Sequence, residues 1–288
     1  MLVELLGYED KKITPLYKER KPAPADVWNL RDYSTWRDDI WRLIDDFADT
    51  KVRSAFLASP PEYVVGDDLR WLDDLVYAEK RIMIDSKAEL TERLRGHYRA
   101  LRAVHGTRTS DLSTFYESGL KRLHPESFHD QAREVFLNGD YPELSEERLQ
   151  DAITAVGSDL RSGRVYFEAN ETMLIDLCGH YMLYGSEYLI CIAAHLGGSR
   201  DYRQILKARG VPTLFICDVP LDFIGEQTLQ EFAGEALELV FQELLDGPQF
   251  RRDKYRGAGF CIYEDLPADC VVGHYHPTIR RDPFSRGY

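Results

Sequence analysis

The chain has 288 residues, with 36 basic and 49 acidic side chains, and therefore a formal charge of −13. This length fits one large domain or two small ones. The 44% of apolar and 30% of charged residues are typical of a globular protein, which excludes a disordered chain and a long coiled coil. The negative charge argues against a general binder of nucleic acid or anionic lipid, since both are negatively charged themselves.

The five cysteines predict a cytoplasmic protein. Their number is odd and no Cys-x-x-Cys pair occurs, so we expect reduced, mostly buried thiols rather than disulfides. The longest apolar stretches are shorter than the roughly 18 residues that a membrane span needs. Glu4 interrupts the first apolar residues, so we expect neither a signal peptide nor contact with a membrane.

Residues 1–100 predict a helical N-terminal region. Residues 1–33 are charged and contain prolines, which favours an extended arm or a loop. Apolar periodicity and capping residues then predict three helices. These are a helix capped by Ser34 that reaches about Phe47, a stretch from Trp71 to about Ile82, and a helix opened by the capping box of Ser86 and Glu89.

Residues 101–288 alternate strands and helices without a regular βαβ repeat, which predicts an α+β domain. The expected strands are residues 102–108, 163–167, 211–220, 259–263 and 270–275. The expected helices are residues 112–116, a helix capped by Ser145, a long apolar helix over 172–196, and residues 228–245.

Two short motifs in this domain carry the functional prediction. The first is His105-Gly106-Thr107, followed by a helix and by Gly119-Leu120, and the second is Val165-Tyr166-Phe167. Their order and context resemble the ADP-ribosyltransferase superfamily, of the diphtheria-toxin and poly-ADP-ribose-polymerase type, with some likeness to RNA 2′-phosphotransferases. The resemblance covers about residues 100–278, and it implies a split β-sheet core.

The resemblance also implies a site for NAD, used as a substrate. Gly106 would let its backbone bond the nicotinamide carboxamide because no Cβ intrudes, and His105 would hydrogen-bond a ribose hydroxyl. Tyr166 and a tyrosine of the next helix, Tyr181 or else Tyr184, would stack on the ring. The full expected NAD-binding set is His105, Gly106, Thr107, Arg108, Tyr166, Phe167, Tyr181 and Tyr184.

The sequence departs from the family at the catalytic carboxylate. The family has a Glu that opens the late strand, and this position falls near Gly259 when it is measured back from Leu266-Pro267. A carboxylate is expected because it stabilises an oxocarbenium-like ribose. The candidates are Glu264, Glu235 and Glu238, and we favour Glu264, acting with His105.

Other charged and histidine-rich stretches give weaker signals. His274-x-His276, even with His124 and His129, lacks a third ligand at a diagnostic spacing, so no metal site is expected. Arg251, Arg252, Lys254 and Arg256 form one basic run, and Arg280 and Arg281 form another. Either run could contact phosphates or be a solvated loop. The sequence has no Gly-x-Gly-x-x-Gly or P-loop segment.

These observations predict an NAD-dependent ADP-ribosyltransferase. It would release nicotinamide and transfer ADP-ribose to a macromolecular acceptor, either protein or nucleic acid, as a toxin or antiviral defence effector that an inhibitory partner protein would restrain. Two alternatives stay open: a relative of the RNA 2′-phosphotransferases, which also use NAD, and a degenerate, non-catalytic module that binds NAD or another nucleotide.

Overall fold

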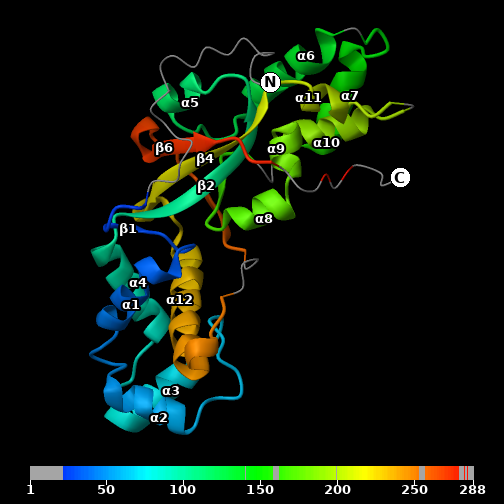
Figure 1. The fold of residues 1–288 in the computed structure, drawn as a ribbon. Coiled ribbons are helices and arrows are strands. Elements are labelled where there is room, and N and C mark those ends of the chain that lie inside the picture. The colour runs from blue at the N-terminus through cyan, green and yellow to red at the C-terminus, as the bar shows by residue number, and fades with distance from the viewer. Residues whose placement is uncertain are drawn as a thin grey trace. The chain divides into compact units, whose positions relative to one another are not determined.

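The computed structural model describes residues 22–139, 141–157, 162–198, 200–252, 257–278, 282 and 284 (Figure 1). It is 51% helix and 15% strand, with an open antiparallel sheet. The expected mixture of helices and strands is therefore confirmed.

The chain folds into two compact units. We call the first the helical unit; it comprises residues 23–102 and 219–258. The second, the sheet unit, contains residues 103–218 and the described residues from 259 onward. Residues 219–258, which we expected in a domain of residues 101–288, thus pack with the N-terminal helices. The boundaries fall inside two strands, at residues 102 and 218.

The helical unit is built around one long helix, α12. Its elements are β1 (Val27–Trp28), α1 (Arg37–Leu43), α2 (Thr50–Ala58), α3 (Arg70–Lys80), α4 (Ser86–His97) and α12 (Glu226–Asp246). Helix α12 packs against α4 and α1, and α2 packs against α3. Trp28 is fully buried, stacks on Tyr98 with ring centroids 6.0 Å apart and meets the edge of Trp36. These large rings fill the core of the unit.

The helix starts of this unit differ in detail from the sequence prediction. Ser34 does not cap a helix, because its hydroxyl donates to Asp32 and α1 begins only at Arg37. Asp85, rather than Ser86, caps α4, and its carboxylate accepts from the backbone N–H of Ala88. The backbone of Asp85 is extended, a conformation in which an Asp side chain readily accepts from a free N–H group of the first turn.

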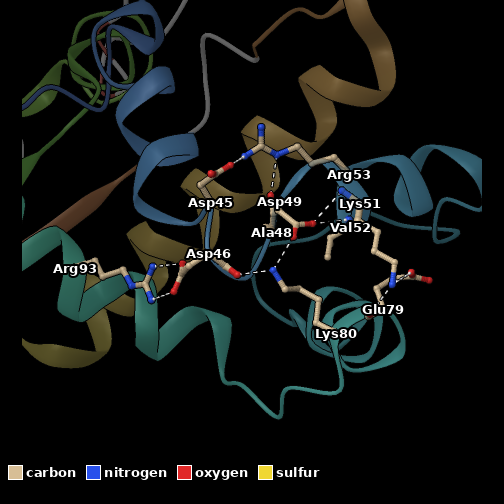
Figure 2. A network of polar contacts seen from close by, with 10 residues as sticks. All are labelled: Asp45, Asp46, Ala48, Asp49, Lys51, Val52, Arg53, Glu79, Lys80 and Arg93. Carbon is tan, nitrogen blue, oxygen red and sulfur yellow. Dashed lines mark hydrogen bonds and ion pairs between the residues drawn. The ribbon is translucent and has the colours of Figure 1, made fainter.

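A polar network fixes the loop between α1 and α2 (Figure 2). Arg93 of α4 donates to both carboxylate oxygens of Asp46. Asp49 caps α2 by accepting from the N–H groups of Lys51 and Val52, and its second oxygen accepts from Lys80 at 2.7 Å. Helices α3 and α4 thereby hold the same short loop from two sides.

The sheet unit contains the strands on which the two sequence motifs lie. The strands are β2 (Ala100–Thr109), β3 (Val165–Glu168), β4 (Val211–Pro220), β5 (Gly259–Ile262) and β6 (Val271–Tyr275), in the order β5-β3-β2-β4-β6. The pairs β2–β3, β3–β5 and β4–β6 are antiparallel. The residues of β2 that pair in parallel with β1, Ala100 and Leu101, belong to the helical unit. All five strands lie within two residues of the ranges expected from sequence.

Seven helices are described in the sheet unit. They are α5 (Ser113–Ser118), α6 (Pro125–Leu137), α7 (Glu146–Val156), α8 (Glu171–Asp176), α9 (His180–Tyr184), α10 (Glu187–Leu196) and α11 (Arg203–Lys207). Ser145 caps α7 as expected, accepting from the N–H of Arg148. Helices α6, α7 and α10 enclose the larger core of this unit, and a smaller cluster joins Val104 and Leu214 of the sheet to Met182 of α9.

The single helix predicted over residues 172–196 is wrong. The segment forms three helices, because the chain breaks at residues 177–179 and again at Gly185, whose φ is +85°. A left-handed conformation of this kind ends a helix and favours glycine. The first of the three is capped by Asn170, which accepts from the N–H of Thr172, so the helix starts one residue before Thr172.

Candidate functional site

Strand β3 stands between β2 and β5 and brings the two sequence motifs together. Val104 of β2 is opposite Glu168, while Tyr166 is opposite Cys261 and Glu168 is opposite Gly259 of β5. Directly opposed residues share a face of an antiparallel pair, and alternate residues along a strand do as well. Tyr166, Glu168, Gly259 and Cys261 therefore lie on one face, which we call the Tyr166 face.

His105 connects the first motif to the second. Its Nδ1 lies 2.8 Å from the backbone carbonyl oxygen of Tyr166, and its ring meets Phe167 edge-on at 6.0 Å. Because a carbonyl only accepts, Nδ1 carries the proton in this contact, and Nε2 of the neutral ring is left as an acceptor. Burial lowers the pKa of His105, against a smaller opposite effect of the bond to Tyr166, so the neutral form is favoured.

The Tyr166 ring is exposed beside an arginine and a second tyrosine. Tyr166 is 47% exposed and Tyr263 is 56% exposed. The Arg164 guanidinium lies 3.5 Å from the Tyr166 hydroxyl and 5.5 Å from the ring centre of Tyr263, and the bond to Tyr166 raises the pKa of Arg164. Two accessible rings beside a cation suit a planar or an anionic ligand.

Gly106 meets apolar side chains of α8 and α9. A Cβ on Gly106 would stand 3.2 Å from Cγ of Met182 and 3.5 Å from Cδ1 of Leu174. In Figure 1 these two helices lie beside β2. The residue of α9 that approaches the first motif is thus Met182, whereas the sequence prediction assigned a tyrosine.

The two predicted helix tyrosines have other contacts. Tyr184 is buried and its hydroxyl donates to Asp282 at 2.8 Å. Tyr181 is half-buried with its ring 4.0 Å from that of His180. Neither contact involves Tyr166. The helix breaks at residues 177–179, before both tyrosines, and this is the reason that the expected spacing does not apply.

Arg108 and Phe167 support the strands. The Nε of Arg108 donates to the carbonyl of Arg209 at 2.7 Å, and burial lowers its pKa. Phe167 is buried and stacks on Phe260 at 5.5 Å. Thr107 is half-buried in β2, two residues beyond His105.

The three predicted carboxylates lie in different surroundings. Glu264 is exposed in a bend after β5. It follows Phe260 by four residues, and because an extended strand rises about 3.3 Å per residue, the two Cα atoms lie up to about 13 Å apart. Glu235 is buried in the helical unit and pairs with Arg252 at 3.2 Å. Glu238 of the same helix accepts from the N–H of Gly66 at 2.7 Å. Glu235 and Glu238 thus make structural contacts within the helical unit.

Glu168 is the carboxylate that sequence reasoning missed. Its Oε2 lies 3.4 Å from the point where a Cβ on Gly259 would stand, and its Oε1 accepts from the backbone N–H of Asn170 at 3.1 Å. Burial is the main cause that raises the pKa of the Cys178 thiol, and the negative charge of Glu168 is the second. The only sequence signal was its place directly after Tyr166-Phe167, since the pairing with Gly259 requires knowledge of the strand register.

Two residues of the basic runs, Arg251 and Arg252, are described, and both bind groups of the protein itself. Arg252 donates to the carbonyls of Leu30 and Arg31 as well as pairing with Glu235, and Arg251 donates to the carbonyls of Pro248 and Phe250. Lys254, Arg256, Arg280 and Arg281 lie outside the described residues.

Histidines and cysteines make no metal cluster among the residues that the structure describes. His274 Nδ1 is 2.8 Å from the Tyr116 hydroxyl, His276 Nδ1 is 2.9 Å from the carbonyl of Pro212, and His129 Nε2 is 3.0 Å from the Tyr188 hydroxyl. All five cysteines are free thiols, and Cys217 alone among them is fully buried. No helix in the described ranges is long and apolar enough to cross a bilayer.

Comparison with known proteins adds no relative. No family model matches the chain, and searches of curated proteins and of solved structures gave no match.

Proposed function

We propose that the sheet unit binds NAD and catalyses ADP-ribosyl transfer, releasing nicotinamide and passing ADP-ribose to a protein or nucleic-acid acceptor. The observation that carries this proposal is the adjacency of β5, β3 and β2, with His105 of the first motif bonded to the backbone of Tyr166 in the second. Two motifs 61 residues apart in the sequence thus meet in one small region.

The chemistry of these groups fits the substrate. Nε2 of neutral His105 is an acceptor suited to a hydroxyl, and it lies on the face of Phe167, because Val104 rather than His105 shares the face of Glu168. The exposed ring of Tyr166 offers a stacking surface for nicotinamide on the Tyr166 face. In the reaction the bond between C1′ of the ribose and the nicotinamide nitrogen breaks, and its electron pair leaves with nicotinamide. An acceptor oxygen or nitrogen then bonds to C1′ and loses its proton to solvent.

Incubation of the purified chain with labelled NAD tests the proposal. We expect free nicotinamide, and label on protein, RNA or DNA when these are supplied as acceptors. His105→Ala should abolish both signals, and it should relieve any growth arrest that expression of the chain causes. The absence of nicotinamide release with every acceptor class would contradict the proposal.

A non-catalytic nucleotide-binding module is the second candidate. It is favoured by the contact of Met182 and Leu174 with Gly106, since an apolar lining lies where the family places the carboxamide. The lack of a side chain at Gly259 favours it too. Such a module would bind NAD in calorimetry and release no nicotinamide.

A further inference from the structure

We infer that Glu168 on β3 is the catalytic carboxylate of this site. It takes the place of a carboxylate at residue 259, the directly opposed position on β5. The inference rests on the proposed NAD chemistry and deepens it, because it assigns a residue that the motifs did not indicate.

The strand register places residues 168 and 259 close together. Glu168 and Gly259 are directly opposed on β3 and β5, and directly opposed residues have Cβ atoms about 5 Å apart. Glu168 reaches toward its partner, with Oε2 3.4 Å from where the Cβ of residue 259 would be. A carboxylate anchored on β3 therefore occupies nearly the space that a side chain at residue 259 would fill.

The surroundings of Glu168 fix its orientation relative to Tyr166. The N–H of Asn170 holds Oε1 at 3.1 Å, and Glu168 is half-buried. Tyr166 and Glu168 lie two residues apart on the same face, a separation of about 7 Å along the strand. A nicotinamide stacked on Tyr166 can therefore extend its ribose toward Glu168.

The negative charge of Glu168 would act on the ribose. As the bond from C1′ to nicotinamide breaks, positive charge develops on the ring, and a nearby carboxylate stabilises it. Glu168 keeps its charge through the step, and the proton of the acceptor passes to solvent.

Five proteins test the assignment: the unchanged chain, Glu168→Gln, Glu264→Gln, Glu168→Ala, and the double variant Glu168→Ala/Gly259→Glu, which is compared with Glu168→Ala. We expect Glu168→Gln to lower nicotinamide release by about 100-fold or more while the Kd for NAD changes by less than about threefold. Glu264→Gln should stay within about twofold of the unchanged chain. The double variant should regain at least about tenfold over Glu168→Ala, because residue 259 then supplies the carboxylate from the opposing strand.

The outcomes separate the two proposals. Normal nicotinamide release by Glu168→Gln, or loss of release in Glu264→Gln alone, overturns the role of Glu168 and leaves the NAD chemistry intact. An unchanged chain that neither binds nor cleaves NAD overturns both. Circular dichroism and thermal melting of each variant show whether it is folded, and the gain in the double variant supports the assignment independently of any loss.

Discussion

Gly66 and Gly234 pack backbone against backbone, so neither has room for a side chain. A Cβ on Gly66 would stand 2.5 Å from the carbonyl oxygen of Gly234, and a Cβ on Gly234 would stand 2.3 Å from that of Gly66. Glu238, one turn further along α12, accepts from the N–H of Gly66. The loop before α3 is thereby fixed closely against α12.

Gly66→Ala should therefore destabilise the protein by about 1–3 kcal/mol, the usual cost of overpacking, because backbone rather than a flexible side chain blocks the new methyl group. Gly96→Ala is the matched control. Gly96 lies in α4 with nothing within 4 Å of its Cβ position, so alanine there should stabilise by about 0.5–1 kcal/mol. Urea unfolding measures both, and equal stability of the two variants would contradict the prediction.

The ion pair of Asp46 and Arg93 should make stability fall in acid. The bond from Arg93 lowers the pKa of Asp46, and a bond from Lys80 lowers the pKa of Asp49. A carboxyl group with a lowered folded-state pKa contributes stability above its unfolded pKa of about 3.9, and this is lost as the pH falls through the folded value.

Asp46→Asn tests this contribution. Because Asp46 is mostly exposed, its pair with Arg93 is worth less than about 1 kcal/mol at neutral pH. The variant should be slightly less stable at pH 7 and should lose less stability between pH 5 and 2, since one linked group is gone. An identical profile for Asp46→Asn would rule out the linkage.

We expect Tyr184 to stabilise the fold rather than to bind NAD. It is buried among the α9–α11 side chains and donates to Asp282, and burial is the main cause that raises its pKa. Tyr184→Phe removes one hydrogen bond and should cost about 0.5–1.5 kcal/mol. Its NAD affinity should equal that of the unchanged chain. A large loss of affinity without a loss of stability would instead give the Tyr184 hydroxyl a role in NAD binding.

The strands were predictable because each is a short apolar run bounded by glycine, proline or charge, as in Val211–Pro220. The breaks in the long helix were not predictable, since its apolar periodicity continues across residues 177–179 and across Gly185, the two places where the chain leaves the helical conformation. The same breaks direct Met182 toward Gly106. Glu168 could not be found from sequence because its relation to Gly259 depends on strand register, which a single chain does not reveal.

The ring of Tyr166 should contribute to NAD binding, and its hydroxyl should not. The ring is the exposed stacking surface, whereas His105 is bonded to the backbone carbonyl of Tyr166, which any residue retains. Tyr166→Ala should weaken NAD binding by about 10-fold or more, the scale of one lost stacking contact. Tyr166→Phe should bind NAD within about threefold of the unchanged chain. Calorimetry decides, and equal weakening in both variants would point to the contact of the hydroxyl with Arg164.

His105 should set an acid limit for both NAD binding and stability. Its pKa is lowered from about 6.5 by burial, so the unfolded chain binds this proton more readily than the folded one. Its contribution to stability is complete above pH 6.5 and is lost as the pH falls toward the folded pKa. Because protonation also converts the Nε2 acceptor into a donor, NAD affinity should be constant from pH 8 to 6.5 and fall below that range. His105→Gln offers a comparison without a titrating ring: its NAD affinity should be lower at pH 7.5 and flat over the same interval. A fall in affinity that is identical in the two proteins would assign the acid limit to another group.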